Sequence, residues 1–239
     1  IIGEKLNPTG VRKLGQALVE KNFDYVKQLA QRQVAWGADL LDVNVGHPQI
    51  DEISIMPKVV EAVISVVEVP LCIDSNDPKI LEAGLRVALG KPLVNSVNGE
   101  EKQLATVLHI VKARGAAVIG LTIAEEGIPS TAEERLAAAG KIIERATKIG
   151  IPIEDIIIDP LVMTVGHNSN AAIVTLKTIE LVKKEFGVNI SLGASNVSFG
   201  LPDRYLLNST FLALAIQAGA TCCITDPVKL GGSIRATDL

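Results

Sequence analysis

The chain has 239 residues, of which 48% are hydrophobic and 21% are charged, and its formal net charge is −4. This length and hydrophobic content are sufficient for a large buried core, in one barrel or in two smaller domains. Lysine and arginine are spread along the chain without a basic run, which argues against nucleic acid or an anionic membrane surface as a partner.

The three cysteines, Cys72, Cys222 and Cys223, lie inside apolar runs and show no CxxC spacing. We therefore expect reduced core thiols, no bound metal and a cytoplasmic protein. No apolar stretch has the length of a membrane span, and the first residues lack the features of a signal peptide. The first apolar run starts at residue 1 without a methionine, so we expect the chain to be a piece whose true start was removed or lies upstream.

Short apolar runs, each followed by a helix-length segment, predict eight strands. The expected strands are Ile1–Glu4, Leu40–Asn44, Leu71–Asp74, Leu93–Asn95, Ala116–Leu121, Asp155–Asp159, Asn189–Gly193 and Thr221–Ile224. A strand–helix alternation repeated this often with short loops predicts a single-domain α/β protein over 1–239, with a closed parallel (β/α)8 TIM barrel. An open doubly wound sheet is the alternative.

Apolar residues at helical spacing predict the intervening helices. The first is expected to end near Trp36, and the others are expected to cover about 51–67, 78–89, 103–113, 132–149, 171–186 and 205–218. Asp77 and Pro78 have the order of a helix cap and first helical residue, and Ser130 and Glu133 have capping-box spacing. The segment after 227 is short and rich in glycine, so we expect the last helix of the barrel to be missing.

Acids and amides stand at or just beyond the end of six of the expected strands. These residues are Glu4, Asp42, Asp74, Asn95, Asp159 and Asn196. In the second strand, Leu41 and Val43 alternate with Asp42 and Asn44, which places the polar pair toward the barrel interior. Strand ends of a parallel barrel converge on one rim, so a polar pocket rich in acceptors and poor in cations is expected there. Such a pocket suits a ligand with an amidine-like N–H edge, as in a pterin ring.

Eight segments in order resemble the pterin-binding barrel methyltransferases that use methyltetrahydrofolate and a corrinoid protein, a group that includes the folate domain of cobalamin-dependent methionine synthase. The segments are IIGEKLN, LLDVNVG, LCIDS, LVNSVN, AVIGLTIAEEGIP, IIIDPL, LGASNVS and RYLLNSTFLALAIQAG. The resemblance implies methyl transfer between N5 of 5-methyltetrahydrofolate and the cobalt of cobalamin carried by a separate corrinoid protein, in a direction that stays open. It also implies a homodimer.

Carried over residue by residue, the resemblance implies that Asp74, Asn95 and Asp159 hold the pterin ring. It places Asn196 near N5 of the folate as the catalytic group, because charge must be stabilised at N5 as the methyl group leaves. For any one of these residues alone, capping a helix or bracing a loop remains an alternative.

Further contacts are expected around the ring. Gly193 permits a close backbone approach or serves only a turn, and Ser96 and Ser195 are expected at the ring edge. Three further polar residues are expected to brace a loop or to support the ligand: Glu4, Asp42 and Asn44. The histidines His47, His109 and His167 form no ligand cluster in the sequence.

Two absences limit the activity. No DxHxxG motif occurs, so the cobalt must come from another protein, and no Cys and His set for an activating zinc occurs, so a complete methionine synthase is excluded. Lys5, Pro8 and Phe199 differ from several family members. The alternatives are a dihydropteroate synthase-like enzyme, whose pyrophosphate needs an Arg and a His that the segment TCCITDP lacks, and a catalytically inactive folate-binding subunit.

Overall fold

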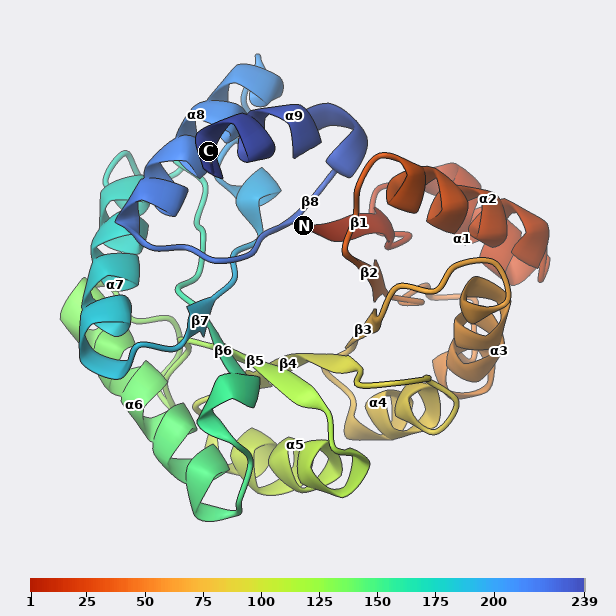
Figure 1. Cartoon of the computed structure of the whole chain (residues 1–239), viewed down its shortest axis with the longest axis horizontal. Helices are drawn as coiled ribbons and strands as arrows, with labels where there is room; N and C mark the ends of the chain where they lie inside the picture. Colours follow the sequence, from red (N-terminus) through yellow and green to blue (C-terminus); the bar gives the residue numbers. More distant parts are fainter. Residues whose placement is uncertain (239) are drawn as a thin grey trace.

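The computed structural model describes residues 1–238 and contains one curved sheet of eight parallel strands in the order β7-β6-β5-β4-β3-β2-β1-β8. Figure 1 shows the strands arranged around a central axis. Their bounds are β1 (Ile2–Leu6), β2 (Leu40–Val43), β3 (Leu71–Asp74), β4 (Leu93–Asn98), β5 (Ala117–Leu121), β6 (Ile156–Asp159), β7 (Asn189–Ile190) and β8 (Ile224–Thr225). The first strand pairs with both β2 and β8, as a TIM barrel requires.

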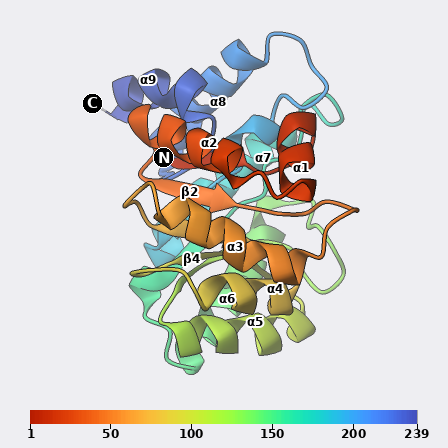
Figure 2. The ribbon, with the colours of Figure 1, turned by 90° about the vertical axis from the view of Figure 1, so that its right-hand side faces the viewer.

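The helices form a ring outside the strands, as Figures 1 and 2 show from two directions. Their bounds are α1 (Arg12–Val19), α2 (Phe23–Ala35), α3 (Glu52–Ile64), α4 (Pro78–Leu85), α5 (Glu101–Arg114), α6 (Ala132–Lys148), α7 (Ala171–Phe186), α8 (Arg204–Ala218) and α9 (Pro227–Asp238). The strand–helix alternation confirms the predicted (β/α)8 barrel.

Alternating residues of each strand belong to two different cores. Leu41 and Val43 are fully buried between the sheet and the helices, whereas Cys72, Leu93 and Ile119 fill the barrel interior. Because side chains alternate between the two faces of a strand, every second residue points into the barrel. Near the carboxyl ends of the strands, these inward-pointing residues are polar. The predicted inward orientation of Asp42 is confirmed, and its side chain is buried.

The predicted absence of the last helix is wrong, because α9 continues the chain directly after β8. Asp226 accepts a hydrogen bond from the backbone N–H of Val228 at 3.1 Å, and Pro227 is the first helical residue. Glycine lowers helix propensity by about 1 kcal/mol at each position. This cap and the burial of Leu230 and Gly231 against the rest of the fold offset that cost.

The caps of the other helices follow the predicted chemistry with one shift. Asp77 accepts from the N–H of Lys79 at 2.8 Å, as expected for a cap before Pro78. The capping box of α6 is formed by Thr131 and Glu134, so the predicted pair one residue earlier is wrong. Thr131 has the extended backbone that a capping residue needs, and the helix starts only after it. Sequence spacing alone did not separate the two pairs.

β7 and β8 meet without a regular strand pairing, at a junction that we call the seam. β7 is only two residues long, shorter than the predicted strand, and β8 begins at Ile224 rather than at Thr221. Gly193 and Ile224 form an isolated bridge across this seam. The backbone N–H of Ile224 also donates to the carbonyl of Leu192 at 2.9 Å. The chain after β7 therefore forms a short 3-10 turn, Ala194–Asn196, beside β8.

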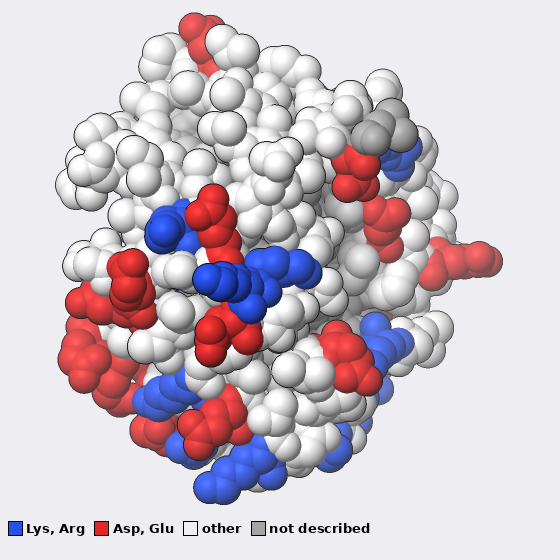
Figure 3. Space-filling view, turned by 60° about the vertical axis from the view of Figure 1, so that its left-hand side comes forward, with Lys and Arg blue, Asp and Glu red and all other residues white. Residues whose placement is uncertain are grey.

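The outer surface carries charges of both signs. Figure 3 shows lysine and arginine interspersed with aspartate and glutamate over the lower part of one face, and few charges over its upper part. Between α5 and α6, for example, Lys141 and Arg145 both contact Glu101. No helix in the described part of the chain has the length and apolar character needed to cross a membrane.

Candidate functional site

A polar cavity of about 390 Å³, which we call the main cavity, opens at the carboxyl ends of the strands. Most of the predicted site residues line it: Glu4, Asp42, Asp74, Asn95, Asp159, Gly193, Ser195 and Asn196. The register places them on adjacent strands, since Asp74 lies opposite Asn95, and Leu121 lies opposite Asp159. The convergence of distant residues on one rim follows from the parallel barrel.

Two amides orient the acids of β2 and β3. Asn95 donates from Nδ2 to Oδ1 of Asp42 at 3.1 Å, and Asn44 donates from Nδ2 to Oδ2 of Asp74 at 3.0 Å. Asn44 itself does not line the main cavity, and its Oδ1 accepts from the N–H of Gly46. Asn44 therefore supports Asp74 from outside the cavity lining, whereas Asp42 both lines the cavity and holds Asn95.

Asp42 and Asp74 form a carboxyl pair inside the barrel. Burial, followed by the negative charge of Asp74, raises the pKa of Asp42 well above its usual range. Burial also raises the pKa of Asp74, but hydrogen bonds from Asn44 and Asp42 act in the opposite direction. Two adjacent carboxylates in a desolvated site cannot both ionise easily, so the pair favours a state in which one proton is retained between them.

Asp159, at the end of β6, is the third acid of the main cavity. Burial raises its pKa to about 6, against the lowering effect of hydrogen bonds from the backbone N–H groups of Leu161 and Gly193 and of the charge of Arg135. The bond from Leu161 to Oδ1 is 2.8 Å long. Above this pKa, Asp159 presents an ionised carboxylate that accepts N–H donors.

Asn196 lies in the 3-10 turn after β7 and is exposed. Within residues 1–238 its side-chain amide takes part in no hydrogen bond of the structure, so both amide ends can reach a ligand. Gly193 has a negative φ, and a Cβ there would lie 3.0 Å from Nδ2 of Asn196. The glycine thus leaves room for the amide, a role distinct from the turn requirement that the sequence suggested.

Glu4 and Ser195 link the first strand to the same turn. The hydroxyl of Ser195 donates to both carboxylate oxygens of Glu4, each at 3.2 Å. Lys5 contacts Glu4 and Asp226, in both cases at 3.3 Å. Glu4 therefore holds the turn that carries Asn196, in keeping with the loop-bracing role considered for it.

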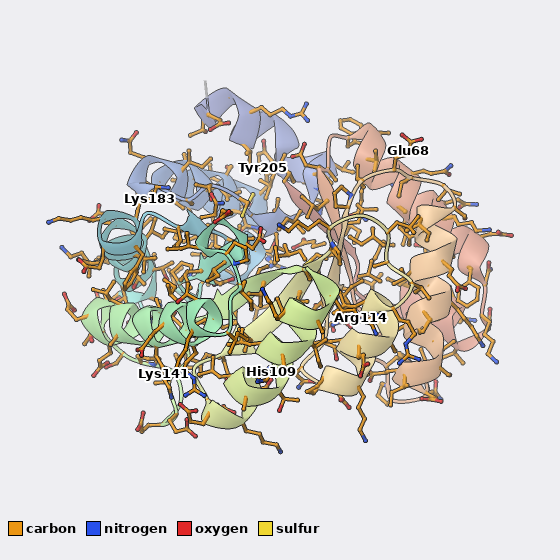
Figure 4. All side chains as sticks on the ribbon, turned by 60° about the horizontal axis from the view of Figure 1, so that its bottom comes forward. Glu68, His109, Arg114, Lys141, Lys183 and Tyr205 are labelled. Atoms are coloured by element: carbon orange, nitrogen blue, oxygen red, sulfur yellow. The ribbon has the colours of Figure 1, made fainter. Side chains whose placement is uncertain are left out.

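Ser96 and the histidines lie elsewhere. Ser96 follows Asn95 at a register shift of β4 and is not among the residues that line the main cavity. His109, labelled in Figure 4, is exposed on α5, outside the barrel. No group of three or more His, Cys, Asp or Glu residues within residues 1–238 has the geometry to hold a metal ion.

Sequence reasoning missed Arg135, a buried cation on α6. Its Nη1 donates to the carbonyls of Pro160 and Leu161, at 2.8 and 2.9 Å, and its Nε donates to the carbonyl of Pro129. These bonds fix the loop that directly follows Asp159. The signal was present in the sequence, because Arg135 interrupts the apolar stripe that Ala139 and Ile142 continue.

The expected shortage of cations is also wrong for the wider mouth of the barrel. Lys5 lines the main cavity, and Arg204 and Lys229 line a smaller cavity beside it. Arg204 and Lys229 stand in the first turns of the last two helices, away from the strand ends on which the prediction rested.

Four acids, an asparagine on β4 and the amide of Asn196 on a turn give the cavity the hydrogen-bond acceptors that suit the N–H edge of a flat polar ring. The fold and the site together define a TIM-barrel protein with an acceptor-rich pocket at the carboxyl ends of its strands. The family model described as "Pterin binding enzyme" matches residues 3–226, and the chain belongs to this family.

Curated relatives include methyltransferases. The chain is 32% identical over 243 residues to the methylcorrinoid:tetrahydrofolate methyltransferase of Eubacterium limosum, covering 100% of this chain and 89% of that protein. It is also 32% identical to the methionine synthase of Mycobacterium tuberculosis, in a match that covers 96% of this chain and 20% of that protein.

Among solved structures, the dihydropteroate synthase of Clostridium difficile, crystallised in the presence of pteroic acid, superposes with a TM-score of 0.78. The sequence identity is 22%, and the match covers 99% of this chain and 94% of the other. This likeness concerns the fold.

Proposed function

We propose that the protein transfers a methyl group between N5 of methyltetrahydrofolate and the cobalt of a corrinoid carried by another protein. The observation that carries the proposal is the main cavity, in which acids and an amide stand at the strand ends of a pterin-binding barrel. The similarity to the methylcorrinoid:tetrahydrofolate methyltransferase over the full chain supports this reaction. The direction of transfer is left open.

Asp74, Asn95 and Asp159 are the residues proposed to hold the pterin. The ring presents a 2-amino group beside a ring N–H, and the ionised Asp159 carboxylate can accept both in a charge-assisted pair. With Nδ2 of Asn95 committed to Asp42, its Oδ1 is free to accept a further N–H. Each of these bonds orients the ring and brings N5 toward the mouth of the barrel.

Asn196 is proposed to act at N5. When the carbon–nitrogen bond breaks, its electron pair stays on N5, and a donated N–H from the amide stabilises that charge. The amide keeps its own proton, so the proton that N5 carries in the tetrahydrofolate product comes from solvent, and it returns to solvent when the transfer runs in reverse. The corrinoid supplies the cobalt that exchanges the methyl group, and the open mouth above Asn196 leaves access for a second protein.

The test is to mix the protein with methyltetrahydrofolate and chemically reduced cob(I)alamin and to follow the cobalt absorption spectrum. Formation of methylcobalamin at a rate proportional to protein concentration supports the proposal. Mixtures without protein and with Asp159→Asn are the controls. Folate binding without any methyl transfer, in either direction, would instead identify a catalytically inactive folate-binding subunit.

A dihydropteroate synthase reaction is the second candidate, because Lys5, Arg204 and Lys229 stand beside the main cavity and a pyrophosphate leaving group requires cations. Incubation with a pterin pyrophosphate and p-aminobenzoate separates the two reactions. We expect no dihydropteroate to form, and its formation together with an absence of methyl transfer would reverse the assignment.

A further inference from the structure

A second cavity, of about 140 Å³, adjoins the main cavity and shares Glu4, Lys5 and Ser195 with it. Its outer side is formed by the first turns of α8 and α9, which contribute Arg204 and Lys229. We call it the basic cavity. The shared residues make the two cavities one continuous surface from the strand ends to the helix starts.

The sign of the charge changes along this surface. Four carboxyl groups and one lysine line the main cavity, whereas three cations and two carboxyl groups line the basic cavity. Lys5 stands at the boundary and is paired with both Glu4 and Asp226. The excess of positive charge therefore lies at the outer end, on Arg204 and Lys229.

Those two cations have no carboxylate within 4.0 Å in the described part of the chain. Arg204 donates from Nη2 to the carbonyl of Ser195 at 2.7 Å and from Nε to the hydroxyl of Ser198 at 3.1 Å. Both acceptors are neutral, so the guanidinium is held in place while its charge stays uncompensated. Arg204 and Lys229 are both exposed, so an anionic group of a ligand can reach them.

The dimensions limit the anion. The basic cavity, of about 140 Å³, is smaller than the main cavity of about 390 Å³, which suits a small charged group at the end of a ligand. Tyr205, labelled in Figure 4, closes one side, and its hydroxyl lies 3.3 Å from the hydroxyl of Ser233 on α9. The cavity is thus bounded by both helices.

A ligand that fills both cavities needs an N–H-rich ring at one end and carboxylates at the other. Folate has this construction, with a pterin at one end and a glutamate at the other. We infer that the basic cavity binds the glutamate carboxylates of the folate substrate, with Lys229 and Arg204 as the recognising cations. This inference rests on the proposed function and adds the residues that would select a glutamate-bearing folate over a bare pterin.

Lys229 is the residue to test, because Arg204 also supports the turn that carries Asn196. Calorimetry would give the dissociation constants of methyltetrahydrofolate and of 6-methyltetrahydropterin, which has no glutamate, for the wild-type protein, Lys229→Gln and Lys229→Glu. Lys184→Gln, an exposed lysine in the last turn of α7 at the opposite end of the barrel, is the matched control. Melting temperatures of all variants would verify folding.

We expect Lys229→Gln to weaken folate binding about threefold to fivefold, the effect of one partly exposed ion pair, and Lys229→Glu to weaken it further. Both losses should shrink at high salt, because exposed charges are screened. Binding of 6-methyltetrahydropterin should not change in either variant, and Lys184→Gln should match the wild type with both ligands.

Equal loss of both ligands in the Lys229 variants, or no loss of either, would overturn the inference. So would unchanged folate binding with slower methyl transfer to a corrinoid protein, which would assign the charge to partner docking. Binding of inorganic pyrophosphate more tightly than folate, and dependent on Lys229, would assign it to phosphate. Wild-type protein that binds neither folate nor tetrahydropterin would refute the proposed function itself, an outcome separate from the others.

Discussion

Asn95 on β4 donates its side-chain N–H to the carboxyl group of Asp42 on β2, at 3.1 Å and across the intervening strand. This bond decides which end of the Asn95 amide is left for a ligand. The carbonyl end remains, so the pocket gains an acceptor and not another donor. We therefore propose that Asp42 positions Asn95.

Substitution of Asp42 should separate positioning from charge. Asp42→Asn keeps an oxygen for Asn95 and an N–H for Asp74, so it should leave folate affinity within about threefold, whereas Asp42→Ala leaves a buried N–H unpaired at a cost of about 1–3 kcal/mol. Titration calorimetry and thermal melts of both variants test this. If Asp42→Ala binds folate as the wild type does, the positioning role is wrong.

The same substitution should alter stability in a pH-dependent way. Burial and the charge of Asp74 raise the pKa of Asp42 in the folded protein. Below the ordinary pKa of an aspartate, Asp42 is protonated in both the folded and the unfolded state and its ionisation does not affect stability. As the pH rises above that value, the unfolded state ionises first and the folded state loses stability. Asp42→Asn cannot ionise. Its melting temperature should exceed that of the wild type at pH 8 by about 2–4 °C for each kcal/mol recovered, and the gain should vanish near pH 4.

Folate affinity should fall at acidic pH because of Asp159. Its pKa is raised to about 6, and only the ionised carboxylate accepts two N–H bonds. The dissociation constant should therefore rise below pH 6, at most about tenfold per pH unit, and stay level above it. Fluorescence or calorimetric titrations between pH 5 and pH 8 give the profile.

Asp159→Asn is the companion measurement for that profile. It should bind folate about 10–100-fold more weakly at pH 7.5, because one charge-assisted hydrogen bond is lost. The inflection of the dissociation constant at acidic pH should also disappear. An inflection that persists in this variant would belong to another group, such as the folate itself.

Asn196→Ala should lower the rate of methyl transfer about 10²–10³-fold and change the folate dissociation constant less than threefold, because the amide acts mainly as charge develops at N5. Single-turnover mixing with cob(I)alamin separates the two quantities. Ser195→Ala is the comparison for loosening of the turn alone, since it removes the hydroxyl that donates to Glu4 and leaves the Asn196 amide in place. A normal transfer rate in Asn196→Ala contradicts the assignment.

Arg135→Met should destabilise the protein by about 3–5 kcal/mol, because it leaves the carbonyls of Pro160 and Leu161 without donors inside the barrel wall. It also removes a positive charge that lowers the pKa of Asp159, so the acidic inflection of folate binding should move to higher pH. Arg145→Met, on the same helix and in an exposed ion pair with Glu101, should change stability by less than about 1 kcal/mol. Equal melting temperatures for the two variants would refute this role.

The barrel and the acids of its rim could be predicted because strand periodicity and loop length act locally. Alternation around Asp42 indicates an inward side chain from four residues of sequence, and the barrel then brings it close to Asp74 and Asn95. The helix α6, which begins at Ala132, was predicted for the same reason.

What could not be predicted depends on packing between distant segments. Helix α9 is stabilised by a cap at Asp226 and by burial against the fold, neither of which glycine content reveals. The partner of Arg135 is a pair of carbonyls about 25 residues away, and backbone acceptors leave no mark in a sequence. Lys229 reaches the mouth only because α9 exists.

The seam between β7 and β8 gives the two halves of the site different mobility. Asp74 and Asn95 lie on strands bonded on both sides, so their displacement requires breaking the sheet. Asn196 is exposed in a turn that follows a two-residue strand, beside the isolated Gly193–Ile224 bridge. Amide hydrogen exchange should thus be faster around Asn196 than around Asp74 and Asn95, so that one edge of the main cavity can adjust while the opposite edge stays fixed.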